Sequence, residues 1–300
     1  MPNPRLFRFG VVAAQARSGE EWIAKARRAE SFGFSTFLMP DTLGQTFSPF
    51  PALAVAAAVT STLRVCPFVL NNDYRNPVLV ARESATLDAL SGGRFELGIG
   101  AGRPGADADY AQLGMPLDSP GTRIERLAES LTLIKAALSG KTVAADGPRY
   151  TGTGIAVFPK PVQQPRPPIL VAGGHKRVLS LAAREADIVA FGVGPDETDD
   201  KLLERIGWMR AAAGDRVDDL ELSVNLLAVG SEMPFYVRTY LKLDPAALAD
   251  IGSPLAISGD TDAMCAQLII RRERLGISYI MVADELMEAA APVVEQLTGR

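Results

Sequence analysis

Histidine and cysteine are nearly missing from this 300-residue chain, which has one histidine and two cysteines. Zinc sites built on two or three histidines are therefore excluded. His175 follows Gly173-Gly174 with no nucleophile elbow nearby, so a Ser-His-Asp triad is not indicated either. Cys66 and Cys265 lie far apart and form no C-x-x-C pair, which indicates neither zinc nor a disulfide framework. We expect no metal site.

Positive charge and long apolar runs are also scarce. The chain has 31 Lys and Arg against 35 Asp and Glu, and its net charge of −4 argues against a nucleic-acid-binding surface. No apolar run reaches the roughly 18 residues that a membrane span needs. The first five residues, MPNPR, lack the apolar region of a signal peptide. We expect a cytoplasmic protein with neither a nucleic-acid partner nor a membrane partner.

Strand and helix patterns alternate along the whole chain. Strands are expected at residues 7–14, 35–40, 63–70, 94–100, 169–172, 188–191, 222–229 and 279–282. Helices are expected at residues 19–32, 50–62, 77–90, 122–138, 176–186, 199–213, 261–275 and 286–297. Residues 139–168 and 230–258 interrupt this rhythm and read as insertions, after the fourth helix and after the seventh strand.

Eight strand–helix units with right-handed crossovers close naturally into a barrel. The alternative, an open doubly wound sheet, usually stops at about five or six strands. The sequence therefore predicts an α/β fold of the (β/α)8 TIM-barrel type, forming a single domain over residues 1–300 with two insertions.

The fourth predicted strand carries an unusual number of glycines. Phe95, Leu97 and Ile99 fall on one face, and the other face has Gly98 and Gly100 after Glu96. Glycine inside a strand indicates that a ligand or another backbone comes close. Residues 100–105 also match G-x-G-x-x-G, but Pro104 and a polar stretch follow, and the next helical pattern begins near residue 122. A dinucleotide-binding fold, which needs a helix there, is not favoured.

In such barrels the chemistry lies where the strands end. The expected strand ends are rich in glycine and poor in carboxylate pairs, which suits an enzyme whose cofactor carries the reactive chemistry. Gly173-Gly174 stands directly before a helix and is followed by His175, Lys176 and Arg177, so this corner is a candidate phosphate site. A tight turn with incidental basic residues, His175 among them, is the alternative.

Residues 91–102 (SGGRFELGIGAG) resemble the fourth-strand signature of the bacterial luciferase-like family of flavin and deazaflavin oxidoreductases. The similarity extends to residues 29–34, 76–88 and 172–187. This resemblance implies a (β/α)8 barrel, usually a homodimer, that uses FMN or the deazaflavin coenzyme F420. It also implies a non-proline cis peptide at Pro67-Phe68 or one residue onward.

The resemblance further implies where the cofactor and the substrate bind. The cofactor-binding candidates are Phe68, Val69, Asn71, Ala101, Gly102, Arg103, Ala172, Gly173, Gly174, His175 and Gly192. The catalytic candidates are Asp41, Thr42 and Tyr110, with Tyr236 and Tyr240 of the second insertion as further proton donors. Asp41 is alternatively a cap for the loop that follows it, and Tyr110 alternatively packs its loop. Phe47, Phe50, Phe235 and Tyr236 either cover an apolar substrate pocket or belong to the core.

Residues 71–77 (NNDYRNP) resemble the actinobacterial deazaflavin-dependent branch. Thr42 replaces a histidine common in that branch, and Arg103 stands where its sugar-phosphate dehydrogenases have an acid, so a sugar-phosphate dehydrogenase is disfavoured. We expect hydride transfer between F420 and a small organic substrate, with reduction of a C=C or C=N bond. The alternative is an FMN-dependent monooxygenase that a partner reductase supplies with reduced flavin. A non-catalytic relative is a third hypothesis.

Overall fold

The computed structural model describes residues 5–103 and 105–300; Pro104 of the glycine-rich loop and residues 1–4 lie outside the described part. Within it, nine strands form one parallel sheet in the order β3-β2-β1-β13-β10-β9-β8-β5-β4. These strands are β1 (Arg8–Val12), β2 (Thr36–Met39), β3 (Arg64–Pro67), β4 (Leu70–Asn71), β5 (Leu97–Gly100), β8 (Ile169–Gly173), β9 (Ile188–Phe191), β10 (Glu221–Leu226) and β13 (Ile277–Ala283).

The sheet closes on itself between β3 and β5. Val65 of β3 bridges to Phe95, and β4 pairs with β5 through Leu70–Ile99 and Asn71–Gly100. β3 and β4 are thus two halves of one barrel strand, separated by Phe68 and Val69, so that nine strands fill eight barrel positions. The predicted (β/α)8 barrel is confirmed, and the third strand, expected as one piece over residues 63–70, is interrupted.

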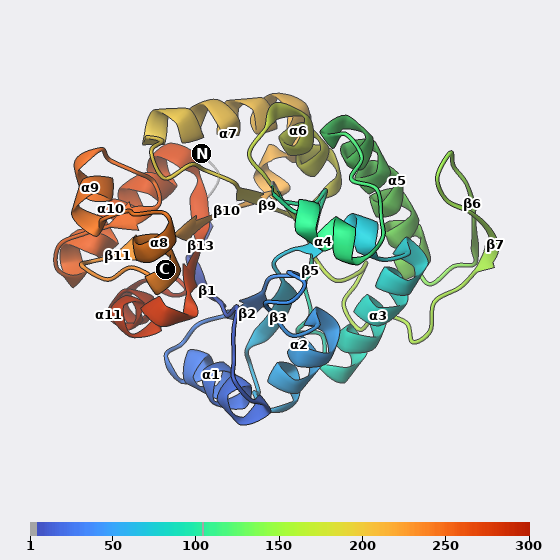
Figure 1. The fold of residues 1–300 in the computed structure, drawn as a ribbon, viewed down its shortest axis with the longest axis horizontal. Helices are drawn as coiled ribbons and strands as arrows, with labels where there is room; N and C mark the ends of the chain where they lie inside the picture. The colour runs from blue at the N-terminus through green and yellow to red at the C-terminus, as the bar shows by residue number, and fades with distance from the viewer. Residues whose placement is uncertain (1–4, 104) are drawn as a thin grey trace.

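Eight helices surround the barrel (Figure 1). They are α1 (Gly19–Ser31), α2 (Pro49–Ala58), α3 (Pro77–Leu90), α5 (Pro120–Leu138), α6 (Lys176–Glu185), α7 (Asp199–Ala213), α10 (Thr261–Leu275) and α11 (Met287–Leu297). Their starts follow local chemistry: Ser18, Asn76 and Asp260 accept capping hydrogen bonds. None of the helices described is long and apolar enough to cross a membrane.

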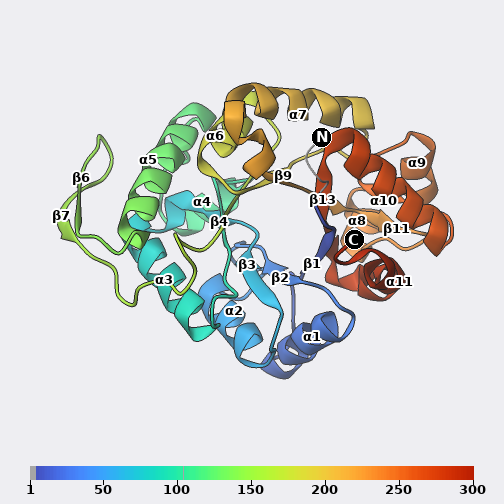
Figure 2. The same cartoon turned by 180° about the vertical axis from the view of Figure 1, so that it is seen from behind.

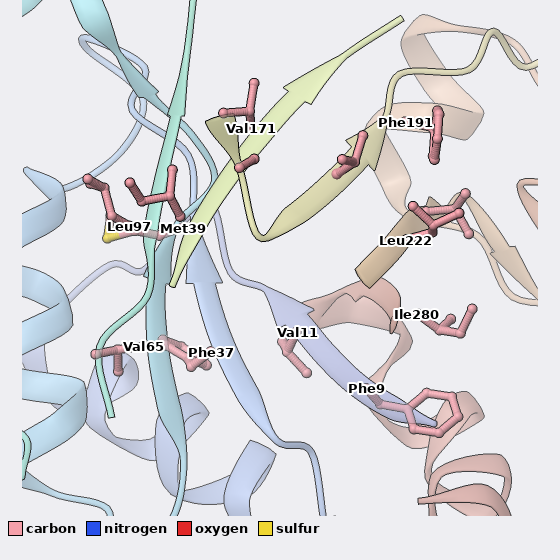
Figure 3. Close-up of a cluster of buried hydrophobic side chains, with 14 of the residues drawn as sticks. Phe9, Val11, Phe37, Met39, Val65, Leu97, Val171, Phe191, Leu222 and Ile280 are labelled. Atoms are coloured by element: carbon pink, nitrogen blue, oxygen red, sulfur yellow. The ribbon is translucent and has the colours of Figure 1, made fainter. Parts of the chain in front are cut away.

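The alternation of side chains along the strands builds two apolar layers. One layer lies between strands and helices, and Figure 3 shows Phe9, Phe37, Leu97 and Ile280 among its members. The other fills the barrel interior and includes Leu38, Cys66, Leu170, Ile188, Ala190, Tyr279 and Met281. The predicted faces of the fourth strand are confirmed, because Phe95, Leu97 and Ile99 join the outer layer. The glycine face therefore points inward.

Both insertions have structure of their own. In the first, β6 (Val143–Asp146) and β7 (Thr151–Ile155) form an antiparallel hairpin that stands away from the barrel beyond α5 (Figure 1, Figure 2). The second holds α8 (Phe235–Tyr240) and α9 (Pro245–Asp250). The prediction of one barrel strand over residues 222–229 is wrong in its second part. Residues Ala228–Val229 form β11, which leaves the barrel and pairs with β12 (Ala256–Ile257).

Besides the two helices of the second insertion, the structure has a short helix in the glycine-rich loop that the sequence pattern did not predict. α4 (Asp107–Gln112) lies in the polar stretch where no helix was expected before residue 122. It is a short helix without a capping side chain. Its Tyr110 is fully buried and its Asp109 nearly so, which shows that tertiary contacts rather than local periodicity stabilise it.

A buried ionic cluster lies at the end of the barrel where the strands begin. The carboxylate of Glu96, 2% exposed, accepts hydrogen bonds from Arg8 Nη1 at 2.8 Å and Arg64 Nε at 2.6 Å. Arg8 also pairs with Glu221 at 2.6 Å and stacks 3.7 Å above the Tyr279 ring. Burial alone would raise the pKa of Glu96, but the Arg8 and Arg64 guanidinium groups hold it below its ordinary value.

This cluster should make folding sensitive to acid. A carboxyl whose pKa is lower in the folded state stabilises the protein above its unfolded pKa, near 4.3, and this stability is lost as the pH falls through the folded pKa. Glu96→Gln, which removes the charge, should cost about 3 kcal/mol in the free energy of unfolding at pH 7. It should also flatten the loss of stability between about pH 5 and pH 3.

Urea unfolding across this pH range measures both effects. Glu20→Gln on the exposed start of α1 is the matched control, and it should follow the wild-type curve. Parallel curves for Glu96→Gln and the wild type would contradict the prediction.

Candidate functional site

The interruption of the third barrel strand shapes the end of the barrel where the strands finish, referred to below as the mouth. The Phe68-Val69 peptide bond is cis, at the second of the two positions that the resemblance implied. Phe68 and Val69 pack on the inner cluster beside Val12 and Ala172. They therefore give the inner wall of the mouth an apolar surface, next to the ends of β5 and β8.

The inward glycines of β5 are required by this interrupted strand. A Cβ atom on Gly98 would lie 1.9 Å from the carbonyl oxygen of Pro67, and one on Gly100 would lie 2.8 Å from Val69 Cγ2. Of the two reasons expected for these glycines, close approach of another backbone accounts for Gly98. A substitution there would displace backbone, whereas at Gly100 it would displace a side chain.

The ends of β8 and β9 meet in the same way. A Cβ atom on Gly174 would lie 2.5 Å from the carbonyl oxygen of Gly192, and one on Gly173 would lie 2.3 Å from Val178 Cγ1. The Gly192 amide donates to Gly173 O at 2.8 Å, and Gly192 O accepts from Arg205 Nη1 at 2.6 Å. The glycines at this corner are therefore explained by contacts within the chain.

The helix that follows this corner offers unpaired donors. His175 occupies the N-cap of α6 but its side chain makes no capping hydrogen bond, so within the described chain no side chain caps the first turn. His175, Lys176 and Arg177 are exposed around it, and Arg177 reaches Glu125 only at 3.4 Å. Unpaired amides, the helix dipole and three basic side chains fit an anionic group such as a phosphate.

Asp41 does not cap a helix; it ties the ends of two strands together. Its carboxylate accepts from Arg75 Nη1 at 2.5 Å and Nη2 at 3.1 Å, and from the Asn71 amide at 3.1 Å. The side chain is 4% exposed. Asp41 thus supplies an acceptor to β4 at the point where the strand interruption breaks the ladder with β2. The neighbouring Thr42 is half-buried, and its amide lies 3.4 Å from Thr46 Oγ1.

Tyr110 lies inside a polar network rather than at the surface of the mouth. Its hydroxyl donates to Asp73 Oδ2 at 2.8 Å, and Asn71 Nδ2 donates to the Tyr110 hydroxyl at 3.3 Å. Arg126 pairs with the same Asp73 carboxylate at 2.8 Å. Burial raises the pKa of Tyr110, so the phenol is protonated at neutral pH. This geometry matches the alternative in which Tyr110 packs its own loop, and the structure adds that its hydroxyl orients Asn71.

Ala101, Gly102 and Arg103 continue from β5 towards α4. Gly102 has a φ of +83°, and a Cβ there would lie 2.8 Å from Arg123 Nη1, which donates to Ala101 O at 3.0 Å. Arg103 pairs with Asp109 at 3.1 Å. Apart from the buried Tyr110, the predicted cofactor-binding and catalytic residues therefore lie along one continuous arc, over the ends of β2, β4, β5, β8 and β9.

Sequence reasoning missed several charged side chains that hold this arc. Arg75 and Asp73 lie in the stretch 71–77, which the sequence singled out only for its resemblance. Arg123 and Arg126, three residues apart on one face of α5, contact the ends of β5 and β4 through Ala101 and Asp73. The three-residue spacing of Arg123 and Arg126 was the one signal that the sequence offered, because the residues that they contact lie far away in the sequence.

A closed (β/α)8 barrel with an interrupted third strand, an apolar inner wall and an uncapped helix start beside basic side chains is an arrangement that suits a cofactor-dependent enzyme. Residues 6–241 match the family described as luciferase-like monooxygenase, and the chain belongs to this family. The predicted membership is confirmed.

Three comparisons illustrate the breadth of this family. An uncharacterized protein of Mycobacterium tuberculosis is 31% identical over 216 residues, 64% of this chain and 72% of that protein. An F420-dependent glucose-6-phosphate dehydrogenase of Beutenbergia cavernae is 28% identical over 232 residues, 74% of this chain and 68% of the relative. The structure of the F420-dependent tetrahydromethanopterin reductase of Methanopyrus kandleri has a TM-score of 0.76 at 18% identity, covering 98% of this chain and 100% of that one.

The Asp41–Arg75 pair provides a test of how the mouth is held. Because the pair is mostly buried, Asp41→Asn or Arg75→Met should each lower the free energy of unfolding by about 3 kcal/mol. The double variant should lose less than the sum of the two, with a coupling energy of about 2 kcal/mol. Urea unfolding of the four proteins measures this cycle.

The exposed pair between Arg28 and Glu288 is the control, and Arg28→Met should cost less than about 1 kcal/mol. Additive losses at Asp41 and Arg75 would show that the pair does not hold the strands together.

Proposed function

We propose that this protein is an F420-dependent oxidoreductase that transfers a hydride between F420 and a small organic substrate. The observation that carries the proposal is the apolar wall of Phe68, Val69 and Ala172 beside the uncapped start of α6. Such a pairing suits a flat ring system joined to a phosphate-bearing chain. The named relative of Beutenbergia cavernae and the resemblance of residues 71–77 favour F420 over FMN.

When bound, the deazaflavin would supply or accept the hydride, and the protein residues would bind, orient and exclude water. Phe68, Val69 and Ala172 would contact the ring, with Asn71, Ala101, Gly102 and Arg103 along one side. Gly173, Gly174, His175 and Gly192 would surround the phosphate, with the first amides of α6 as hydrogen-bond donors. The residues present at the mouth thus fit the group.

The protein must also place a proton beside the substrate. Asp41 accepts hydrogen bonds from Arg75 and Asn71, an arrangement that suits a fixed charge which orients its neighbours. The Tyr110 hydroxyl donates a hydrogen bond to Asp73 and accepts one from Asn71 Nδ2, so it acts on the mouth through Asn71. Thr42 follows Asp41 at the mouth and is the remaining hydroxyl of the three catalytic candidates. We therefore assign Asp41 and Tyr110 to positioning and Thr42 to contact with the substrate.

The preferred reaction is reduction of a C=C or C=N bond. Arg103 is paired with Asp109, and no histidine follows Asp41, so two features expected of a sugar-phosphate dehydrogenase differ in this chain. A deazaflavin carries hydride and reacts poorly with oxygen, whereas reduced FMN activates oxygen.

Cofactor titration tests the proposal. We expect F420 to bind with a micromolar or lower Kd in fluorescence titration. FMN should bind at least tenfold more weakly, because we assign the site to the deazaflavin. Reduced F420 should be oxidised by an α,β-unsaturated aldehyde or ketone without uptake of oxygen. Tight FMN binding with oxygen consumption and undetectable F420 binding would replace the proposal with the monooxygenase alternative.

We also propose a homodimer formed through α2 and α3. α2 has no polar side chain, and Val55 is exposed on it. Leu79 and Leu90 of α3 are 53% and 75% exposed, and with Phe50 and Ala54 they line a groove between the two helices, to which Arg82, Glu83 and Thr86 add polar groups. An apolar helix face of this kind marks an interaction surface.

Light scattering should give about twice the 31.9 kDa chain mass. Leu79→Glu combined with Leu90→Glu should shift the mass to that of one chain, because two charges would be buried in the interface. Ile270→Glu on the exposed face of α10 is the matched control and should leave the dimer intact. A single-chain mass for the wild type would exclude this interface.

A further inference from the structure

The second insertion carries a concentration of exposed aromatic side chains. In residues 235–241, Phe235, Tyr236 and Tyr240 are 64%, 45% and 76% exposed, and Leu241 is exposed beside them. The rings of Phe235 and Tyr240 contact each other edge to face at 6.4 Å. Isolated exposed apolar residues are ordinary, but a cluster of large ones indicates a binding surface.

This segment is anchored at the mouth of the barrel. Val237 is fully buried, and the Phe235 amide donates to Glu285 Oε2 at 2.9 Å. Glu285 lies two residues after β13, and α8 follows β10 and β11, so both ends of this contact come from segments that leave the finishing ends of barrel strands. Figure 1 shows α8 and α4 on opposite sides of the opening of the barrel. The helix that carries the aromatic cluster therefore lies at the rim of the mouth, across the opening from α4.

Most of the charged side chains at the mouth are paired, although among the described residues the Glu285 carboxylate accepts a hydrogen bond from the Phe235 amide and forms no ion pair. Arg75 pairs with Asp41, Arg103 with Asp109, and Arg205 with Glu197. Lys25 reaches Asp284, beside Glu285, at 2.6 Å. The exposed basic groups at the start of α6 belong to the corner assigned to the cofactor phosphate. A substrate in this mouth thus meets paired charges and aromatic rings.

Tyr236 adds to the uncharged character of the cluster. Burial, and to a lesser degree the negative charge of Glu285, raise the pKa of its phenol, which is neutral at physiological pH. Arg238 on the same helix is exposed, and an anionic substrate would bind to this side chain instead. This alternative is one outcome of the test below.

We propose, building on the proposed function, that the substrate is an uncharged molecule with an apolar, ring-sized body, and that Phe235, Tyr236 and Tyr240 contact that body. Aromatic side chains bury large areas and favour offset or edge-to-face contact with planar groups. The cluster is thus a specificity determinant, and the residues of the arc orient the reacting bond.

Two aldehydes that share a conjugated C=C bond serve as probes: trans-cinnamaldehyde, which has a phenyl ring, and crotonaldehyde, which has a methyl group. In each reaction reduced F420 gives a hydride, water or the protein gives a proton, and the products are the saturated aldehyde and oxidised F420. We expect kcat/KM for cinnamaldehyde to exceed that for crotonaldehyde at least tenfold. Phe235→Ser with Tyr240→Ser should lower the cinnamaldehyde value about tenfold and leave crotonaldehyde and the F420 Kd within twofold.

Ile270→Ser, an exposed apolar position on α10, is the matched control and should change neither value. Equal use of the two aldehydes by the wild type would overturn the substrate class while leaving the proposed function intact. Binding of glucose 6-phosphate that Arg238→Ala abolishes would overturn it as well. A change of oligomer mass in the Phe235/Tyr240 variant, without loss of discrimination, would instead make the cluster a contact between chains.

Saturation-transfer NMR of the protein with oxidised F420 or FMN separates the inference from the reaction. If neither aldehyde is reduced, the proposed reaction fails, but transfer to the phenyl protons of cinnamaldehyde still reports contact with the cluster. Loss of that transfer in the Phe235/Tyr240 variant supports the inference. Unchanged transfer, or no transfer in the wild type, overturns it.

Discussion

The close approach of Gly98 to the carbonyl of Pro67 is the constraint on which the mouth of this barrel depends. Because Gly98 has no Cβ, the backbone of the third strand can turn inward against β5, where a Cβ would lie 1.9 Å from that oxygen. The strand can then be interrupted, so that Phe68 and Val69 face the interior. Leu70 and Asn71 rejoin β5 directly afterwards. The absence of a side chain at Gly98 thus allows Phe68 and Val69 to form the apolar wall on which the proposed function rests.

The interruption would leave the backbone of the strand short of partners, and charged side chains replace them. Asp41 accepts the Asn71 amide that a regular ladder would have satisfied, and Arg75 neutralises the carboxylate. At the opposite end, the buried carboxylate of Glu96 receives hydrogen bonds from Arg8 and Arg64, which are themselves partly exposed. Buried charges at both ends are therefore paired, as burial requires. The lower cluster fixes the strand starts, and the upper pair fixes the shape of the mouth.

Much of the fold could be predicted because its signals are local. α3, α7 and α10 have the expected bounds. Pro77 with the Asn76 cap marks the start of α3, and the Asp260 cap marks that of α10. α4 could not be predicted, because the burial of Tyr110 stabilises it rather than its own pattern. The contacts between residues of the candidate site could not be predicted either, because they join distant parts of the chain. Asp41 and Arg75, for example, are 34 positions apart. Sequence alone indicated that the glycines matter, but not that Gly174 packs on Gly192.

The pairing of charges also constrains how a proton can reach a substrate. Asp41 accepts hydrogen bonds at both oxygens from a guanidinium group, so protonating it would break that pair. The Tyr110 hydroxyl already donates to Asp73, which Arg126 holds in place. Donation from either group would require a buried network to rearrange, which costs free energy in a low-dielectric interior. A hydroxyl outside these networks avoids that cost, and Thr42 is the catalytic candidate in that position. Under the proposed function the fixed charges would orient the mouth, and water held beside Thr42 would supply the proton.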